Sequence, residues 1–422
     1  MRIGICGLGT VGSGLFNLLK NNRIEVERKI GQQISVAQVG CRRDHPDCDL
    51  SSTNVTRDIF EVANNPEVDV LVELIGGTEV AKDLVMQAIS NGKHIVTANK
   101  ALIALYGEEV FSAAKKAGVS VHYEAAVAGG IPIIKAIREG LAGNRVKWVA
   151  GIINGTTNFI LTEMSGEGSN RSFDDVLLEA QSLGYAEADP TFDVEGIDAA
   201  HKLTILAAIA FGAPLDFAAI YTEGISAITV DDIKSADELG YCIKHLGIAR
   251  KGESGLELRV HPALVAKDQM LAQVNGVMNA VMVSSDAAEA TIYCGAGAGA
   301  GPTASSVMAD IIDVVRGAEV PELGFVSSTS LVTLPIESIQ SSYYMSLGVV
   351  DRAGVMANVS TILSRHNVSI EAIIQKDARR GDPQIVILTN EVLESEIIKV
   401  ISEIEANDVV TSRVSMIRVS NL

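Results

Sequence analysis

The stretch RIGICGLGTVG, residues 2–12, decides the fold of the amino-terminal part of the chain. A short, largely apolar run typical of a strand leads directly into the glycine pattern Gly7 to Gly12, and residues of helical period follow. In such a unit the glycines allow a tight turn and a close approach of the backbone to a pyrophosphate, which the helix N-terminus faces. The glycine pattern alone is a weak signal, but this context predicts a dinucleotide site rather than an ordinary glycine-rich turn.

Strands alternate with helices throughout residues 1–128, which places this part in the α/β class. The segments that predict strands are RIGIC, SVAQVG, VDVLVEL, HIVTA and VSVHYEA. Such alternation favours a parallel sheet with helices on both faces. We therefore predict a Rossmann-type dinucleotide-binding domain over residues 1–128. A helix near residues 303–320 is expected to return to it, with Asp310 and Asp313 in its first turns.

The rest of the chain changes character twice. Residues 129–330 combine alanine-rich helices with glycine-rich segments that we interpret as loops, such as GAGAGAGPT at 295–303, and they predict an α+β domain. Strand and helix periods then alternate over residues 341–422 in the order βαββαβ, with a turn at DARRGDP, residues 377–383. This order predicts a ferredoxin-like domain.

Composition narrows the class of protein. The 422 residues include 34 basic and 52 acidic ones, a formal net charge of −18, which disfavours broad surfaces for nucleic acid or an anionic membrane. No apolar run approaches the ~18 residues that span a bilayer, and glycines interrupt the first segment, which is therefore unlike a signal peptide. The five cysteines are scattered, without a C-x-x-C pair, and suit a reducing compartment. We expect a soluble, cytoplasmic protein.

The end of the second predicted strand bears on the choice of cofactor. An acid usually stands there when the cofactor is NAD, because it binds the ribose 2′-hydroxyl. This chain instead has Arg42 and Arg43, and arginine can bind a 2′-phosphate. We therefore predict a preference for NADP, with Arg57 as a helper and with use of NAD left open. The alternative is a solvated basic turn.

The segment GIDAAHKLTILAAIAFG, residues 196–212, predicts a helix that is apolar on nearly every face and therefore buried. Its first turns carry Asp198 and Lys202, four residues apart and so within reach of each other. A lysine held beside a carboxylate stays charged and is a candidate proton donor. The alternative is a lysine whose stem crosses apolar surface to solvent. His201 lies off this face and is expected to serve packing or hydrogen bonding.

Two further segments supply candidate residues. The acidic loop LGYAEADPTFDVEG, residues 183–196, contains Glu187 and Asp193 and leads into the helix just described. The segment TANKALIA places Asn99 and Lys100 at the end of the fourth predicted strand, at the edge where open α/β sheets bind ligands.

The run AQSLGYAEADPTFDVEGIDAAHK, residues 180–202, resembles the signature of the homoserine dehydrogenase family. INGTTNFIL, GAGPTASSVMADI and VELIGG resemble further motifs of that family, and the likeness covers residues 1–330. The final block, with DRAGVMANVSTILSRHNVSIEAI, resembles an ACT regulatory domain. The resemblance implies reversible NAD(P)H-dependent reduction of L-aspartate 4-semialdehyde to L-homoserine in threonine, methionine and isoleucine biosynthesis. It also implies a catalytic and dimerisation domain over 129–330 and a homodimer or homotetramer.

The resemblance also implies roles for individual residues. Lys202 matches the catalytic lysine that protonates the substrate oxygen, and Asp198 matches its carboxylate partner. Substrate contacts fall to Glu187, Asp193, Thr156 and Lys100. Cofactor contacts fall to Gly7, Leu8, Gly9, Thr10, Val11, Gly12, Gly76, Lys100, Gly184 and Gly301, beside Arg42 and Arg43. A sodium ion would be held, mostly through backbone carbonyls, by Glu124, Val127, Gly129 and Ile131.

The ACT-like block is expected to bind an amino-acid effector. We predict L-threonine at the strand-to-helix turn, around Gly354, Val355 and Asn358, although Ala353 stands where such domains often have proline. Two other functions remain open from the residues: a different nicotinamide oxidoreductase of amino-acid metabolism, and a sensor that binds nucleotide and amino acid without catalysis.

Overall fold

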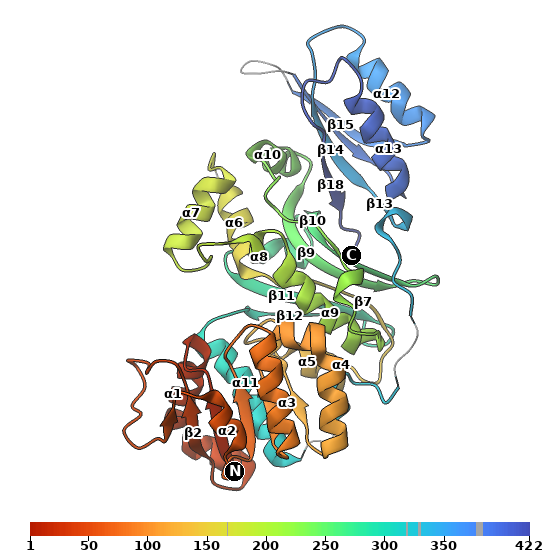
Figure 1. Cartoon of the computed structure of the whole chain (residues 1–422). Helices are drawn as coiled ribbons and strands as arrows, with labels where there is room; N and C mark the ends of the chain where they lie inside the picture. Colours follow the sequence, from red (N-terminus) through yellow and green to blue (C-terminus); the bar gives the residue numbers. More distant parts are fainter. Residues whose placement is uncertain (167, 318–319, 328–330, 377–382) are drawn as a thin grey trace. The chain divides into compact units, whose positions relative to one another are not determined.

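The computed structural model of the chain is drawn in Figure 1, and it describes residues 1–166, 168–317, 320–327, 331–376 and 383–422. Two compact units divide the chain. The first unit comprises Met1–Val149, Asp198–Ile220 and Met278–Leu331, and the second comprises Ala150–Ile197, Tyr221–Val277 and Val332–Leu422. The boundaries expected from the sequence, 1–128, 129–330 and 341–422, stay a prediction. The expected turn at DARRGDP lies, except for its last residue, outside the described residues.

A parallel sheet forms the centre of the first unit, as predicted. Its strands lie in the order β3-β2-β1-β4-β5-β6, all parallel. The bounds are β1 (Arg2–Cys6), β2 (Ser35–Gly40), β3 (Val55–Thr56), β4 (Val70–Glu73), β5 (His94–Thr97) and β6 (Val121–His122). The chain leaves β1 toward β2 and later returns to its other side as β4. Ligands of open sheets bind outside the carboxyl ends of the strands at such a switch point.

Two of the strand predictions need correction. The short β3 was not expected. VSVHYEA forms a strand only at Val121 and His122, and a 3₁₀ helix covers Glu124–Ala126. The physical reason is that the backbone N–H of Glu124 donates to the carboxylate of Asp310 at 2.7 Å instead of to a neighbouring strand.

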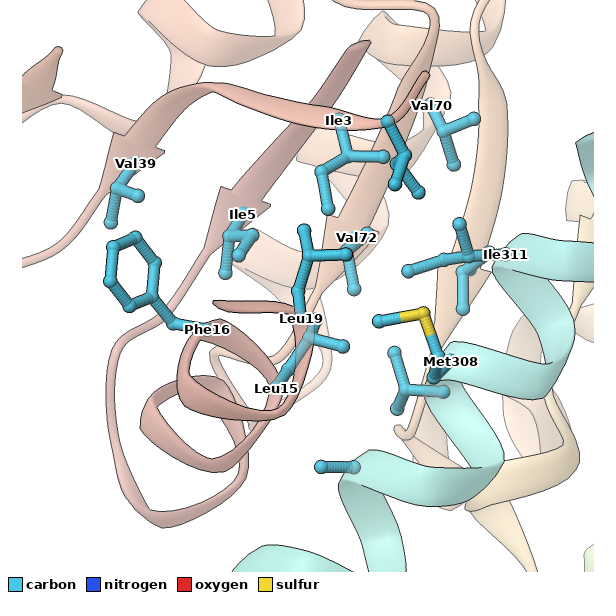
Figure 2. Packing of buried hydrophobic residues seen from close by; sticks show 14 of the residues in the cluster. Ile3, Ile5, Leu15, Phe16, Leu19, Val39, Val70, Val72, Met308 and Ile311 are labelled. Atoms are coloured by element: carbon cyan, nitrogen blue, oxygen red, sulfur yellow. The ribbon is translucent and has the colours of Figure 1, made fainter. Parts of the chain in front are cut away.

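Helices cover this sheet and complete its core. They are α1 (Thr10–Ile30), α2 (Ile59–Asn64), α3 (Glu79–Ser90), α4 (Lys100–Ala117) and α11 (Ala300–Arg316). Figure 2 shows how Leu15 and Leu19 of α1 face Met308 and Ile311 of α11, with strand residues behind them. A side chain at Gly14 would lie 2.5 Å from the carbonyl oxygen of Ala300, so α1 and α11 need glycine to pack this closely.

The interpretation of GAGAGAGPT as a loop was wrong for most of its length. Strand β12 (Ala290–Ala296) includes its first two residues and α11 includes its last four, so that only residues 297–299 connect them. Pairing of β12 with β11 (Met278–Ser285) overrides the low strand preference of glycine. Asp310 and Asp313 consequently lie in the later turns of α11 rather than in its first turns.

The helix predicted over 196–212 is α9 (Ile197–Phe211), and nearly all its residues are buried, as expected. The ring of His201 stacks on Phe217 with 4.3 Å between centroids, which confirms the expected packing role. The first unit also contains a short α5 (Ile133–Lys135), a π-helix (Ala136–Gly140) and a 3₁₀ helix (Phe217–Ala219). Strand β7 (Val146–Ile152) begins in this unit and ends in the second.

The second unit has a sheet in the order β9-β10-β18-β14-β16-β15, with β8 beside β10. Its strands are β8 (Tyr221–Thr222), β9 (Tyr241–Lys251), β10 (Leu256–Ala266), β14 (Tyr343–Gly348), β15 (Ile370–Lys376), β16 (Gln384–Thr389) and β18 (Ser415–Val419). Its helices are α6 (Gly155–Met164), α7 (Phe173–Ser182), α8 (Thr191–Val194), α10 (Val230–Glu238), α12 (Val355–Arg365) and α13 (Glu394–Glu405). A short pair, β13 (Gln340–Ser341) and β17 (Val392–Leu393), lies apart from this sheet.

The predicted βαββαβ order is confirmed as β14-α12-β15-β16-α13-β18. This block shares a sheet with the rest of the second unit, because β18 pairs in parallel with β10. It also shares a core, in which Tyr344 and Ile417 pack with Ile233 and Ile243. Within the described residues, no helix combines the length and the apolar character needed to cross a membrane.

Candidate active site

The glycine turn after β1 is shaped by contacts that exclude side chains. Gly7 has φ +101° and its N–H donates to the carbonyl of Gly40, and a Cβ there would lie 2.4 Å from Leu74 O. A Cβ on Gly12 would lie 2.0 Å from Gly7 O, whereas Gly9, the N-cap of α1, faces open space. The first N–H groups of α1 have no partner inside the helix. This turn therefore has the backbone geometry of a pyrophosphate site.

The arginines after β2 differ in their surroundings. Arg42 and Arg43 are exposed and form no hydrogen bond or ion pair with any residue in the described part of the chain. Arg57, the expected helper, donates to Cys41 O at 3.2 Å and to the Asp44 carboxylate at 2.9 Å. Its guanidinium is therefore already paired, and the two exposed arginines are better placed to meet an anion.

A buried carboxylate that sequence reasoning missed organises the carboxyl ends of β4 and β5. Glu73 is fully buried, and it accepts hydrogen bonds from the Thr97 hydroxyl at 2.5 Å and from Ile75 N at 2.9 Å. Burial raises the pKa of Glu73, against the opposing effect of these hydrogen bonds. The signal in the sequence was an acidic residue closing the apolar strand in VELIGG.

The same network sets the start of α4. Asn99 donates from its amide to Gly77 O at 2.7 Å, and its Oδ1 accepts from Leu102 N at 3.0 Å, which caps the helix. Thr97 Oγ1 accepts from Asn99 N at 2.9 Å. Gly76 and Gly77 both have φ near +70°, which a side chain would disfavour. Lys100 is thus held at the first position of α4, at the edge of the sheet.

Asp198 joins two lysines from different elements. Lys202 Nζ lies 2.7 Å from Asp198 Oδ2, so the contact predicted from the spacing is confirmed. Lys100 Nζ lies 3.1 Å from the other oxygen, Oδ1. The side chains are 5% exposed for Asp198, 11% for Lys202 and 33% for Lys100. One buried carboxylate therefore contacts two ammonium groups from different helices, one through each of its oxygens.

The second unit holds the other candidate group, built on α6 and the acidic loop. Asn154 caps α6 by accepting from Thr157 N, and its amide donates to Asp193 Oδ1 at 2.8 Å. The Thr156 hydroxyl donates to Tyr185 O at 2.7 Å. The structure therefore brings Asp193 and Thr156 to the start of α6, and Asn154 is a residue that sequence reasoning missed. Its signal was an asparagine placed as an N-cap.

The remaining residues of the acidic loop are less constrained. The carboxylate of Glu187 is exposed, while its carbonyl accepts from the Gln181 amide at 3.0 Å. Gly184 follows α7 with φ +75°, and Gly301 lies in the first turn of α11. The chain runs from α8, which carries Asp193, through residues 195 and 196 directly into α9.

The segment 124–131 is buried and tightly bonded. The Glu124 carboxylate accepts from Ile134 N at 2.8 Å and Lys135 N at 2.9 Å, and burial raises its pKa to about 7. Ala128 and Gly129 both have positive φ, 54° and 50°. Gly129 O accepts from the Ser306 hydroxyl at 2.7 Å, and Val127 and Ile131 are buried.

Asp310 and Asp313 of α11 lie next to this segment. Burial raises the pKa of Asp310 to about 6. With His122 they could form a set of metal ligands by distance, within the part of the chain that is described. The Lys135 ammonium, however, lies 2.5 Å from Asp313 and 3.4 Å from Asp310, so this cluster already contains its cation.

The turn between β14 and α12 holds the expected effector residues. Gly354 is the N-cap of α12 with φ +94°, a conformation that favours glycine. Val355 is buried in the core of the C-terminal block, whereas Asn358 is exposed one turn along the helix. The backbone N–H of Asn358 donates to Gly354 O at 3.0 Å, as expected for the first turn of the helix.

Sequence profiles of three domains match the chain. The homoserine dehydrogenase NAD binding domain matches residues 7–124, homoserine dehydrogenase matches 132–312, and the ACT domain matches 343–408. A homoserine dehydrogenase of Pseudomonas aeruginosa is 57% identical over 432 residues, covering 100% of this chain and 99% of that protein. The chain belongs to the homoserine dehydrogenase family.

Other relatives support the same family assignment. A homoserine dehydrogenase of Neisseria gonorrhoeae is 51% identical, covering 100% of this chain and 99% of that protein. The crystal structure of a homoserine dehydrogenase from Thiobacillus denitrificans has a TM-score of 0.94 at 51% identity, covering 100% of this chain and 98% of that one. A hyperthermophilic archaeal homoserine dehydrogenase in complex with NADPH has a TM-score of 0.64 at 27% identity, covering 75% of this chain and 98% of that one.

The enzyme is therefore an oxidoreductase of amino-acid biosynthesis that uses a nicotinamide cofactor and interconverts L-aspartate 4-semialdehyde and L-homoserine. Family membership sets aside both alternatives that the residues left open, another oxidoreductase and a sensor without catalysis.

Replacing Glu73 with Gln tests the buried carboxylate. Because the pKa of Glu73 is raised above its ordinary value of 4.5, the folded chain keeps this proton at pH values where the unfolded chain has lost it. This group therefore lowers the free energy of unfolding as pH rises from about 4.5 toward the folded pKa. We expect the wild type to lose stability over that window relative to Glu73→Gln, as measured by urea unfolding.

The control is Glu108→Gln, which changes an exposed carboxylate on α4. Parallel curves of unfolding free energy against pH for the wild type and Glu73→Gln would contradict the assignment.

Proposed function

We propose that Lys202 is the proton donor to the aldehyde oxygen of L-aspartate 4-semialdehyde, with Asp198 as the carboxylate that holds it. The nicotinamide cofactor supplies the hydride to the carbonyl carbon. The proton passes from Lys202 Nζ to the oxygen, which completes the alcohol, and the reverse reaction returns it. The observation that carries the proposal is the buried Asp198 carboxylate, which contacts Lys202 at 2.7 Å and Lys100 at 3.1 Å.

Electrostatics supports this assignment. Negative charge grows on the substrate oxygen as hydride arrives, and an ammonium already fixed in place stabilises it without reorganisation. Asp198 holds the Lys202 ammonium in one position, so that its charge and its proton can be directed at the oxygen. A Lys202 that only extended to solvent would be more exposed than 11%. Lys100, at the sheet edge, is proposed to lie between cofactor and substrate.

The acidic loop is proposed to bind the amino-acid part of the substrate. Carboxylates attract the substrate ammonium, and Glu187 and Asp193 are the proposed groups. Asp193 accepts from the Asn154 amide, which fixes its orientation. The Thr156 hydroxyl donates its hydrogen bond to Tyr185 O. The hydroxyl oxygen of Thr156 can therefore accept a hydrogen bond from the substrate. Gly184 and Gly301 are proposed to border the nicotinamide.

The cofactor is proposed to bind along the Gly7 to Gly12 turn, including Leu8, Thr10 and Val11, and beside Gly76. NADP is the proposed preferred cofactor and NAD the weaker one. Two observations support this preference: Arg42 and Arg43 are exposed at the end of β2, and no acid stands at that strand end before Asp44. Asp44 itself is paired with Arg57 at 2.9 Å.

A sodium ion is proposed to bind the carbonyls of Glu124, Val127, Gly129 and Ile131. Hard oxygen donors suit such a cation. The Glu124 carboxylate is occupied by two backbone N–H groups, so this residue would contribute its carbonyl. The positive φ values at Ala128 and Gly129 turn successive carbonyls out of a regular path. A rise of the melting temperature with sodium, absent with a matched potassium concentration, is the measurement that tests this site.

L-threonine is proposed as the inhibitory effector at Gly354, Val355 and Asn358. The exposed amide of Asn358, beside the glycine N-cap, can bind the carboxylate and the ammonium of an amino acid. Val355 would contact the side chain of that amino acid. A homodimer or homotetramer in the cytoplasm is proposed on the family resemblance, and light scattering of the purified enzyme measures its mass.

Replacing Lys202 with Ala should lower kcat by roughly 10²- to 10⁴-fold, the usual worth of a positioned proton donor. The dissociation constant for NADPH, measured by fluorescence, should change by less than about twofold, because the variant loses an interaction with the transition state and not with the cofactor. The control is Lys147→Ala, which removes an exposed lysine of β7. Normal turnover of homoserine by Lys202→Ala would refute the role.

Replacing Arg42 with Asp removes the cation that binds a 2′-phosphate and provides an acid for the ribose hydroxyls. We expect the ratio of kcat/KM for NADPH over NADH to fall roughly 10- to 100-fold, the worth of one charge-assisted hydrogen bond. Arg43→Asp tests the neighbouring residue in the same assay. Arg28→Asp, on the exposed face of α1, is the control. An unchanged ratio in both variants would contradict the preference.

Replacing Asn358 with Ala should raise the inhibition constant for threonine roughly fivefold, the effect of one lost hydrogen bond. A point variant is preferable to removal of residues 341–422, because that deletion would strip β18 from β10. Thr361→Ala, on the exposed face of the same helix, is the control. Equal inhibition of Asn358→Ala and wild type would place the effector elsewhere.

A further inference from the structure

An ion cluster in the second unit joins the C-terminal block to the segment that follows β8. Arg418 of β18 is 1% exposed, and its guanidinium contacts two carboxylates. Its Nη1 lies 2.6 Å from Glu223 Oε2, and its Nε and Nη2 both donate to Glu394, the Nε at 3.0 Å. Tyr221 completes the cluster: its hydroxyl accepts from Nη2 at 3.0 Å and its ring lies 4.8 Å from the guanidinium carbon.

Glu394 fixes the cluster to the C-terminal block. It is the first residue of α13, 1% exposed, and it also accepts from the Tyr343 hydroxyl at 2.8 Å. Tyr343 belongs to β14, which pairs with β18. The position of the Arg418 guanidinium is therefore set from three elements of one block, and it cannot shift without disturbing them.

Glu223 leads to the acidic loop. It follows directly after β8, and its N–H donates to Val260 O at 2.8 Å while its carbonyl contacts His245 Nε2 at 2.9 Å. Two residues later, Ile225 N donates to Val194 O at 2.9 Å. A Cβ on Gly224 would lie 2.5 Å from Val194 O, so the two backbones are in direct contact.

Ser226 adds a second contact, because its hydroxyl donates to the Glu195 carboxylate at 2.5 Å. Val194 and Glu195 are the neighbours of Asp193, and Asp193 is one of the groups proposed to bind the substrate. The segment 223–226 therefore contacts the end of the acidic loop, and Arg418 forms an ion pair with Glu223, the first residue of that segment.

We propose that Arg418 is a positioning residue for substrate binding, which acts through Glu223 on the Val194–Glu195 backbone and so on Asp193. The inference rests on the proposed substrate role of Asp193. Arg418 lies beyond residues 343–408, the range that matches the ACT domain. A residue of the C-terminal block that lies outside the proposed effector turn would thereby help to position the acidic loop.

Burial energetics distinguish this role from simple stabilisation. Burying the Arg418 guanidinium with the Glu394 carboxylate costs desolvation, and replacing such a buried ion pair with apolar residues is often neutral or stabilising. What the ions specify is geometry, since the planar guanidinium binds carboxylates in fixed directions. A positioning role therefore changes substrate affinity, whereas a purely structural role changes the melting temperature alone.

The test measures KM for homoserine, KM for the cofactor and kcat in the full-length enzyme. Arg418→Met should raise KM for homoserine roughly 10- to 100-fold, the scale of an ångström-sized misplacement of a binding group. KM for the cofactor should change less than about twofold, because no part of the cluster lies in the nucleotide-binding unit. Arg418→Lys, which keeps the charge, should recover part of the affinity. Arg365→Met, which removes an exposed ion pair of the same block, is the control.

Glu223→Gln is the second variant, and it should raise KM for homoserine in the same way even if Arg418→Met does not fold. Asp193→Asn separates the inference from the proposed function. An unchanged KM in Asp193→Asn overturns the substrate role of Asp193. A raised KM in Asp193→Asn with unchanged values in Glu223→Gln and in folded Arg418 variants overturns only the positioning role.

Discussion

The buried carboxylate of Asp198 is the interaction on which the candidate active site depends. It contacts an ammonium from its own helix at 2.7 Å and another from α4 at 3.1 Å. Two ammonium groups in a medium of low polarity repel each other, and a carboxylate that contacts both offsets this repulsion. The same contact therefore allows α9 to be buried together with the ammonium that is proposed as the proton donor. The Asp198 carboxylate thus serves both the packing of α9 and the proposed proton transfer.

The parallel sheet supplies the frame for that contact. Its strands end at one edge, where the Gly7 turn, Glu73 and Asn99 lie on neighbouring strands. Glu73 is costly to bury, and its hydrogen bonds to Thr97 and to the backbone of the following turn offset part of that cost. In return the network fixes the cap of α4 and hence Lys100. A residue with no proposed contact to substrate thus sets the position of one that has.

The C-terminal block is more than an appended regulatory module. Its strand β18 continues the sheet of β10, and its Arg418 reaches residues next to the acidic loop. Regulation by an amino acid requires that the effector favour one of two states of the enzyme. The block has a physical means to do so, because β18 carries Arg418, Arg418 contacts Glu223, and the residues after Glu223 contact Val194 and Glu195 of the acidic loop. The turn proposed to bind the effector and the acidic loop proposed to bind the substrate belong to one compact unit.

The sequence by itself determined the features that depend on neighbours along the chain. Local periodicity specified the strand–turn–helix unit at Gly7, the buried helix α9, the Asp198–Lys202 contact and the βαββαβ order, because each is set within a few residues. It misjudged GAGAGAGPT, since glycine content resembles a loop until β11 supplies a partner strand. Only the tertiary structure decided that Lys100 meets Asp198, that Asn154 orients Asp193, and that Arg418 contacts Glu223 at a sequence separation of 195 residues. These pairs are brought together by sheet order and helix packing, which no local pattern encodes.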